Sequence, residues 1–540
     1  MQDMEPELCN ENSEMGFAIN QRVHSVGDPR RTGTVKYIGP VKGFAGIWVG
    51  IDWDNGEGKH DGSINGVRYF EANNEKSGSF VRRQNLSKGI SFLEALELRY
   101  RGSSSKEEED EMYVLSAGNK RVFVQLVGKN KVQDKFNHFE ELVGVSLSYM
   151  GISSVGSPKE IEATVPNIKQ LDLTGNLFSN WEDVDCLCEG LQKLEILDLT
   201  KNLLSHYVMG LMRLKNVRVL VLNSSGINWA QIERLNPSLE MIEELHLMGN
   251  KLKTIVPASS NRVQGFISLR LLNLEDNLFN TWDEILKLSW LRSLEQLQLN
   301  KNHLSRIFYP DHCSESSKPH EKGFKPFNNL RCLLLGDNKI ADLPSVDCLN
   351  YFPNLTDIRL SGNPITDQTN GGIPRFVLIA RLEKVQILNG SEVSSRERKE
   401  SEIRYVRYVI TQMQDRLGEI AYIHPRFDKL KALHGIEDEK SSNDMKGPQK
   451  MASGLLSITL KSCGASMGEK PPVTKKIPAT TIVGKLKVLC ESFFKLKGNK
   501  LKLFLVEEDS PFPVLLVDDM ASLVDLGIIN EATIIIDHED

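Results

Sequence analysis

Two short blocks near the N-terminus place aromatic, cationic and glycine residues at close spacing. The first is GFAGIWVG at 43–50, and the second is GKHDGS at 58–63. Aromatic side chains can form an apolar slot, and lysine, arginine and histidine can donate hydrogen bonds to carboxylates. Glycines let a loop approach a ligand backbone closely. These blocks can therefore supply an aromatic slot, donors for a carboxylate and a loop that lies close to a ligand.

The candidate residues fall into three groups with different tasks. The slot is assigned to four aromatic residues, the carboxylate to two cations and an imidazole, and the close approach to two glycines and the serine after them. An alternative stays open, since Trp48 and Phe70 could fill a small core and Lys59 could be a solvated surface residue. The slot residues are Phe44, Trp48, Trp53 and Phe80; the residues assigned to the carboxylate are Lys59, Arg82 and His60; the residues assigned to the close approach are Gly58, Gly62 and Ser63.

With VRYF at 67–70 and GSFVR at 78–82, these blocks resemble the CAP-Gly family of small Gly-rich β domains. The resemblance implies a groove that binds a short acidic peptide ending in Tyr or Phe, as on the C-terminal tail of α-tubulin. His60 stands where the family has Asn, and the segment from Phe44 to Trp48 is one residue shorter than usual. We hypothesise that His60 strengthens binding of the tail as the pH falls through about 6.5, where histidine gains charge.

A second feature is an internal repeat of the form L-x-x-L-x-L-x-x-N-x-L, which predicts a leucine-rich-repeat solenoid. Alternating leucines predict a short strand in each unit with its side chains in a shared core. The recurring Asn is assigned to hydrogen bonds with the backbone of neighbouring coils. The nine units begin at 142, 168, 194, 217, 242, 269, 294, 330 and 355.

The remaining segments complete a multidomain fold. A polar insertion within 305–327 should loop out of the solenoid, and the charged helix at 395–417 should cap it. After a linker, LLSITLK, an amphipathic helix with Ile482, Leu486, Leu489 and Phe493/Phe494 on one side, and three further β runs predict a ubiquitin-like β-grasp domain. The expected boundaries are CAP-Gly domain 16–90, helical and acidic linker 91–135, repeats with helical cap 136–420, linker 421–452 and ubiquitin-like domain 453–540.

Composition excludes several classes of function. The 540 residues carry 66 basic and 72 acidic side chains, a net charge of −6, so charge gives no attraction to nucleic acid or anionic membranes. Neither an apolar run of membrane-spanning length nor a signal peptide is expected, and the scattered cysteines are read as reduced thiols without a metal. The sequence predicts a cytoplasmic, cytoskeleton-associated protein without a cofactor.

The order of the three domains resembles the tubulin-folding cofactor E family, the tubulin-specific chaperones E. The resemblance implies binding of α-tubulin, assembly and disassembly of the α/β-tubulin heterodimer, and cooperation with cofactors B, C and D. A CAP-Gly adaptor on microtubules is the alternative, although the sustained heptads and basic flanks typical of adaptors are missing. An enzyme is disfavoured because no phosphate-binding, metalloprotease or serine-hydrolase motif is found.

Overall fold

The structure is a computed structural model that divides into two compact units, residues 1–363 and 364–540, which we describe separately. The acidic segment 103–111 lies outside the described residues, as do 311–324 of the insertion and 437–450 of the linker. The described residues are 16–101, 113–115, 121–123, 138–205, 207–208, 210, 212–258, 262–310, 325–367, 371–412, 423–436, 455–462, 471–494, 501–506, 513–516, 523, 526, 528 and 530–538.

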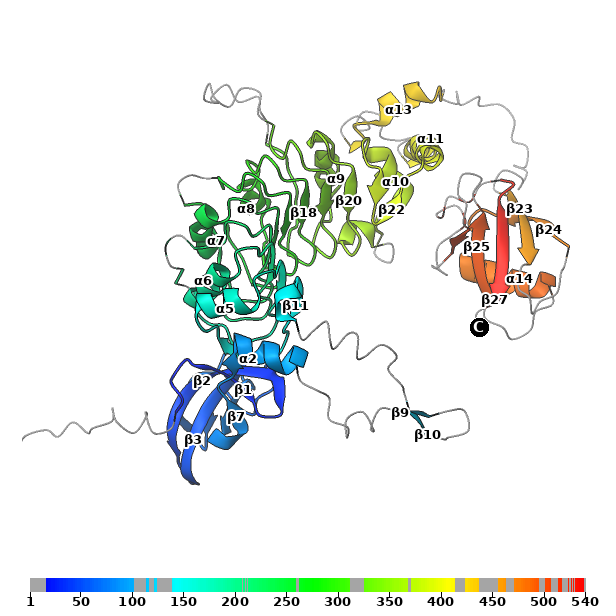
Figure 1. Cartoon of the computed structure of the whole chain (residues 1–540). Coiled ribbons are helices and arrows are strands. Elements are labelled where there is room, and N and C mark those ends of the chain that lie inside the picture. The colour runs from blue at the N-terminus through cyan, green and yellow to red at the C-terminus, as the bar shows by residue number, and fades with distance from the viewer. Residues whose placement is uncertain are drawn as a thin grey trace, which may run out of the picture. The chain divides into compact units, whose positions relative to one another are not determined.

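The first unit begins with a small, strongly bent antiparallel sheet in the order β6-β3-β2-β1-β7. Figure 1 labels β1, β2, β3 and β7 of this sheet. Its core is built mainly of β-branched and aromatic side chains, among them Val23, Val35, Val49 and Ile51, all fully buried. The elements are β1 (Arg22–Ser25), β2 (Asp28–Val41), β3 (Phe44–Trp53), β4 (Ser63–Ile64), β5 (Val67–Arg68), β6 (Gly78–Val81), the 3-10 turn η1 (Arg83–Asn85) and β7 (Leu86–Ser87).

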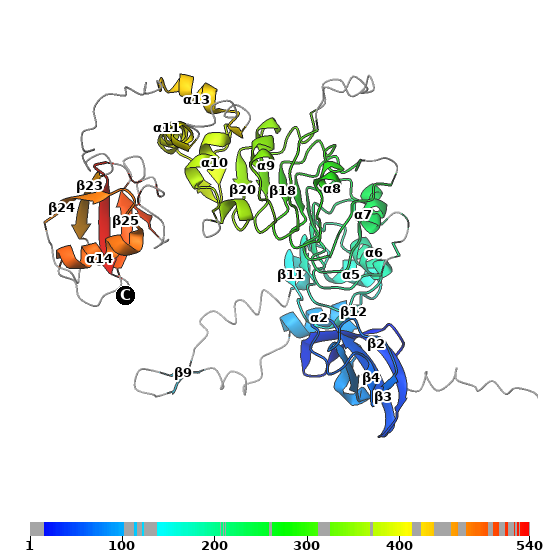
Figure 2. The same cartoon turned by 180° about the vertical axis from the view of Figure 1, so that it is seen from behind.

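The next residues join this bent sheet, which we call the barrel, to the repeats. Strand β8 (Ile90–Ser91) pairs in parallel with β12 (Ile152–Ser154) of the first repeat, and α2 (Phe92–Leu96) packs against both strands. Figure 2 shows α2 and β12 beside the barrel. A capping box starts the helix, because the Ser91 hydroxyl accepts from Glu94 N–H and the Glu94 carboxylate accepts from Ser91 N–H. The helix continues into the π-helical turn η2 (Glu97–Arg101), and β9 (Tyr113–Leu115) and β10 (Arg121–Phe123) form a hairpin.

The predicted linker 91–135 therefore begins later than expected. Phe92, Ala95 and Leu96 are fully buried, so residues 90–96 belong to the body of the first unit. The helical pattern of this stretch was the only basis for the prediction. Which face of a short helix is buried becomes visible only in the folded unit.

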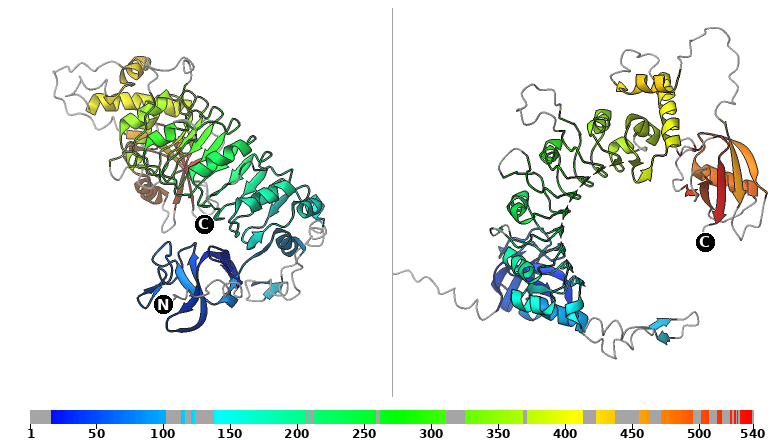
Figure 3. Two further views of the ribbon diagram at one scale, coloured as in Figure 1. Left: turned by 90° about the vertical axis from the view of Figure 1, so that its left-hand side faces the viewer. Right: turned by 45° about the horizontal axis from the view of Figure 1, so that its top comes forward.

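Each predicted repeat contributes one three-residue strand to a continuous parallel sheet, with leucines such as Leu171 and Leu297 buried. In Figure 3 the strands line the inner side of a curved array and the helices its outer side. The strands are β11 (Gly144–Ser146), β13 (Gln170–Asp172), β14 (Ile196–Asp198), β15 (Val219–Val221), β16 (Glu244–His246), β17 (Leu271–Asn273), β18 (Gln296–Gln298), β19 (Cys332–Leu334) and β20 (Asp357–Arg359). The helical turns are η3 (Phe139–Glu141), α5 (Pro158–Thr164), α6 (Trp181–Gly190), α7 (Trp229–Leu235), η4 (Asn236–Ser238), α8 (Trp282–Leu286), α9 (Leu343–Cys348) and η6 (Leu349–Tyr351).

The recurring asparagines have the structural task that the sequence predicts. Asn176 is fully buried; its carbonyl accepts from Ile152 N–H at 2.9 Å, and its amide donates to the carbonyls of Leu147 and Leu173. The repeat that begins at 217 carries Ser225 in place of Asn, and its hydroxyl donates to the Leu199 carbonyl. These bonds satisfy backbone groups that would otherwise be buried without partners.

The second unit contains a helical segment and a β-grasp domain. Helices α10 (Arg375–Arg381), α11 (Ser395–Gln412) and α13 (Phe427–Leu433) share one apolar cluster around Tyr405. Residues 427–433 therefore belong to a packed helix rather than to the predicted linker 421–452, because Phe427 and Leu430 are buried in that cluster. The short elements here are η7 (Pro364–Thr366), β21 (Ile387–Leu388) and β22 (Ser391–Glu392).

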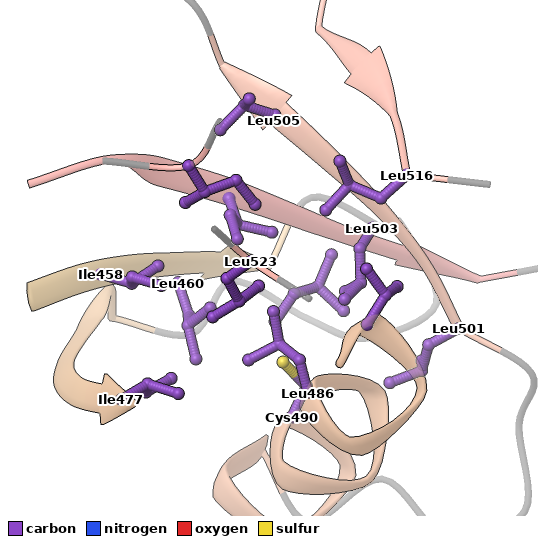
Figure 4. Packing of buried hydrophobic residues seen from close by; sticks show 14 of the residues in the cluster. Ile458, Leu460, Ile477, Leu486, Cys490, Leu501, Leu503, Leu505, Leu516 and Leu523 are labelled. Carbon is purple, nitrogen blue, oxygen red and sulfur yellow. The ribbon is translucent and has the colours of Figure 1, made fainter. Parts of the chain in front are cut away.

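The C-terminal sheet has the order β24-β23-β27-β25-β26, and its central pair β23–β27 is parallel, which is the ubiquitin-like β-grasp topology. Figure 4 shows Leu486 and Cys490 of the helix facing Leu503 and Leu523. The buried face of that helix is Val483, Leu486, Cys490 and Phe494. Leu486 and Phe494 are buried as predicted, whereas Val483 and Cys490 are buried in place of the predicted Ile482 and Leu489. The elements are β23 (Leu455–Ser462), β24 (Val473–Pro478), α14 (Val483–Phe494), β25 (Leu501–Val506), β26 (Val514–Leu515) and β27 (Thr533–His538).

Candidate functional site: an aromatic groove on the N-terminal barrel

The start of β3 forms an exposed aromatic edge. The rings of Phe44 and Trp48 meet edge to face at 6.0 Å, and Phe44 is 48% exposed. The Arg82 guanidinium lies 3.7 Å from the centre of the Trp48 ring and donates to the carbonyls of Ala45 and Ile47. Arg82 therefore holds the loop that carries the aromatic pair, besides presenting a positive charge there. The buried indole N–H of Trp48 has no acceptor among the described residues.

A second aromatic cluster adjoins the glycine loop. Phe80 contacts the rings of Tyr37, Tyr69, Phe70 and His60 at centroid distances of 5.0–6.0 Å. Phe80 and His60 are among the predicted site residues, whereas Tyr37 and Tyr69 are not. Tyr69 stands in the quoted VRYF block, so its aromatic ring was a usable signal, whereas Tyr37 lies on a different strand and joins the cluster only through folding.

Backbone geometry requires the two glycines of the loop. Gly62 has φ +97°, and a Cβ there would lie 2.0 Å from the Phe70 carbonyl oxygen. At Gly58 a Cβ would lie 2.4 Å from the Ser77 backbone. The loop is held against β6, because the Lys59 and His60 N–H groups donate to the Gly78 carbonyl. Only glycine fits at either position without displacing backbone.

The polar residues of the loop divide into structural and free groups. The Asp61 carboxylate accepts from Ser63 N–H at 3.0 Å and pairs with Arg68 at 2.7 Å, so Ser63 contributes its backbone to the turn. Lys59 is exposed, and its ammonium makes no ion pair with any residue that the structure describes. Lys59 is therefore the cation of the loop that remains available to a ligand carboxylate.

Trp53 does not join the exposed aromatic edge, contrary to the sequence analysis. It is 3% exposed and belongs to the barrel core with Val23 and Ile51. Successive side chains of a strand point to opposite faces, so Trp48 and Trp53, an odd number of residues apart, face opposite sides of β3. The same alternation places Phe44 and Trp48 on one face and could have excluded Trp53 from the slot in advance.

His60 takes over the local bond that an Asn side chain can make at this position. Its Nδ1 accepts from Gly62 N–H at 3.0 Å, an Asx-turn-like contact, and its ring packs on Phe80. Burial lowers the pKa of His60 from 6.5; the Asp61 charge opposes this in part, and Lys59 adds a smaller lowering effect. Both findings oppose the hypothesis that acid strengthens binding through this imidazole, because protonation would break the bond to Gly62.

We expect ligand affinity to be constant above about pH 6.5 and to fall below it. The folded loop favours the neutral imidazole, so its contribution to stability is fully present above the ordinary pKa of 6.5 and is lost as the pH drops toward the lowered value. Titration of binding between pH 5.5 and 8 checks this. His60→Asn keeps an acceptor for Gly62 N–H and should remove the pH dependence, whereas His60→Leu should weaken binding roughly 2–10-fold at every pH. If the affinity of His60→Asn still fell below about pH 6.5 as in the wild type, another titrating group would be responsible for the pH dependence.

Other kinds of site are not found in the described part of the chain. No group of histidine, cysteine, aspartate and glutamate there is arranged to hold a metal ion. None of the described helices has the length and apolar character needed to cross a membrane.

The chain is similar to known proteins in its N-terminal domain and over nearly its whole length. The CAP-Gly domain family matches residues 19–86. Tubulin-folding cofactor E of Arabidopsis thaliana is 59% identical over 530 residues, 98% of this chain and 99% of that protein. Tubulin-specific chaperone E of Danio rerio is 32% identical over 502 residues, 90% and 92% of the two chains. The solved C-terminal ubiquitin-like domain of mouse tubulin-specific chaperone e covers 17% of this chain and 96% of that one, with 20% identity and a TM-score of 0.16.

Proposed function

The chain belongs to the tubulin-folding cofactor E family, and we propose that it binds the acidic C-terminal tail of α-tubulin through the aromatic groove of its CAP-Gly domain. The observation that carries the proposal is the combination of an exposed aromatic edge, Phe44 and Trp48, with Lys59, a cation of the glycine loop that makes no ion pair within the described part of the chain. The terminal aromatic residue of the tail would enter the slot, and Lys59 would meet its carboxylate.

The curved parallel sheet of the repeats is the surface that we assign to the body of tubulin. Its outward strand positions include half-buried Val219, Val221 and Leu334 beside polar residues, a mixture that suits a protein surface. A sheet of this extent fits a large protein partner better than a small substrate. The chain would act without catalysis of its own in assembling, and in reverse separating, the α/β-tubulin heterodimer together with cofactors B, C and D in the cytoplasm.

Binding of the intact chain to unpolymerised tubulin tests the proposal. We expect tight binding to intact tubulin, clearly weaker binding to tubulin that lacks the α C-terminal aromatic residue, and a fall in polymerisable tubulin when the chain is added. The chain alone should not hydrolyse GTP. Binding restricted to assembled microtubules would favour the adaptor function instead, and equal binding to both tubulin forms would remove the slot from the mechanism.

A further inference from the structure

A cleft of about 810 Å³ lies between the barrel and the loop edge of the first repeats, away from the exposed aromatic edge. The barrel wall comes from the start of β2, the end of β3 and the loop at 73–74. The repeat wall comes from the loops that follow β11, β13, β14, β15 and β16. Both walls belong to the first compact unit.

Direct contacts hold the two walls together. Besides the β8–β12 pairing, the Arg30 guanidinium lies 5.7 Å from the centre of the Tyr149 ring, which joins the rim of one wall to the other. Gly151 of the first repeat lies so close to the barrel that a Cβ there would come within 2.7 Å of the His24 imidazole. The cleft is thus a feature built by the fold of this unit.

The charges that line the cleft are positive once internal pairing is counted. The one lining carboxylate, Asp54, accepts two hydrogen bonds from Arg22 and one from Thr32, so its charge is neutralised within the barrel. Three lining cations remain: Arg30, Lys201 and Lys251. Lys251 makes no ion pair with any described residue, and among the described residues Lys201 contacts the ring and the hydroxyl of Tyr149.

The positive charge of the cleft lining does not continue along the whole solenoid. Residue positions just before the repeat asparagine carry Lys201 in the third repeat but Asp276 in the sixth. In the seventh repeat, Lys301 is paired with Glu275 at 3.1 Å. Lys201 and Lys251, which line the cleft beside the barrel, make no ion pair with the described residues, an arrangement that suits an acidic ligand.

Neutral polar groups in the cleft match a polypeptide backbone. The side-chain amides of Asn73 and Asn74 make no hydrogen bond to the described residues, and each offers a donor and an acceptor, as a peptide group requires. Trp53 also lines the cleft, and its buried indole N–H has no acceptor among the described residues. Trp53 thus contributes to this wall and not to the aromatic slot.

We propose that the cleft binds an extended, glutamate-rich polypeptide segment, separately from the aromatic terminus held by the slot. Lys201 and Lys251 meet its carboxylates, and Asn73 and Asn74 pair with its backbone. The assignment of this segment to tubulin rests on the proposed function, whereas the cleft and the chemistry of its ligand do not depend on it. A bound acidic segment would contact the barrel and the repeats at once.

The test uses the intact chain and two fluorescent peptides, one a glutamate-rich 12-mer without an aromatic residue, the other a short tail peptide that ends in tyrosine. We expect Lys201→Ala/Lys251→Ala to weaken the glutamate-rich peptide about 5–20-fold, and the wild-type affinity to fall steeply with salt. Lys339→Ala, an exposed lysine at the same repeat position as Lys251 but outside the cleft, is the matched control and should leave binding unchanged. A photo-reactive group on the peptide should cross-link near Leu203 and Asn74.

Each possible result of this test either supports or overturns the assignment of the cleft to an acidic peptide. Equal loss in the double variant and in Lys339→Ala would overturn the proposal, since it would reduce the effect to general charge attraction. Cross-links confined to the aromatic edge would also overturn it. Preferential binding of a nucleoside triphosphate in competition with the peptide would assign the cleft to a different ligand. Failure of the tyrosine-ended peptide to bind wild-type protein would instead contradict the proposed function and leave the cleft result standing.

Discussion

Replacing Phe92 with alanine is expected to destabilise the first compact unit by about 3–5 kcal/mol, the usual cost of removing a large aromatic side chain from a packed core. Phe92 is fully buried in α2, which packs against β8 and β12 at the junction of barrel and repeats. The loss should appear as faster hydrogen exchange in α2 and β12, because those elements lose their shared packing first.

Leu98→Ala provides the control for this prediction. Leu98 lies in the helical turn that directly continues α2 but is 57% exposed, so its truncation should change stability by less than about 0.5 kcal/mol. Hydrogen exchange of β23 and β27 in the ubiquitin-like domain should remain the same in both variants. If Phe92→Ala left exchange at β12 unchanged, the helix would not couple the barrel to the repeats.

Lys59→Ala is expected to weaken binding of the α-tubulin tail by about 10–100-fold, since hydrogen bonds to charged groups contribute about 1.5–3 kcal/mol. The Lys59 ammonium makes no ion pair with the described residues, and the backbone bond to Gly78 does not depend on the side chain, so its truncation should leave the fold intact. Fluorescence anisotropy with a tyrosine-ended tail peptide measures the change. The effect should shrink at high ionic strength, because salt screens an exposed charge pair.

Two further variants test whether the loss of affinity comes from the Lys59 charge at its position or from the net charge of the domain. Lys76→Ala removes an exposed lysine of the same domain and should leave the affinity within twofold of wild type. Lys59→Arg keeps the positive charge and should recover part of the affinity, although the guanidinium presents its donors in a different geometry. A similar loss in Lys59→Ala and Lys76→Ala would mean that the tail is held by net charge and not at the loop.

Much of the repeat architecture was predictable because it is local and periodic. A leucine pattern with one Asn per turn determines a short strand, a buried leucine row and a satisfied backbone in each coil, as at Leu171 and Asn176. Where a unit departs from the pattern, as with Ser225 for Asn, the hydroxyl makes the equivalent bond to the preceding coil. The family of the N-terminal domain was likewise readable from its glycines, two of which no other residue can replace.

The membership of the candidate site was only partly predictable. Phe44, Trp48, Lys59 and Phe80 could be named because they stand in contiguous blocks, whereas Tyr37 joins the aromatic cluster from another strand. Trp53 was misplaced because spacing in the chain was weighed without strand alternation. The direction of the His60 effect depended on a hydrogen bond to Gly62 and on burial, and neither is visible in the sequence.

The sequence by itself determined the three domain types and the chemistry of the glycine loop, because both depend on residues close together in the chain. Tertiary structure alone decided that α2 is buried and that Arg30 meets Tyr149 across a cleft. The physical reason is that burial and charge pairing depend on neighbours far apart in the chain. Lys201 and Lys251 look like ordinary surface lysines in the sequence, and only the barrel packed opposite them turns them into the wall of a binding cleft.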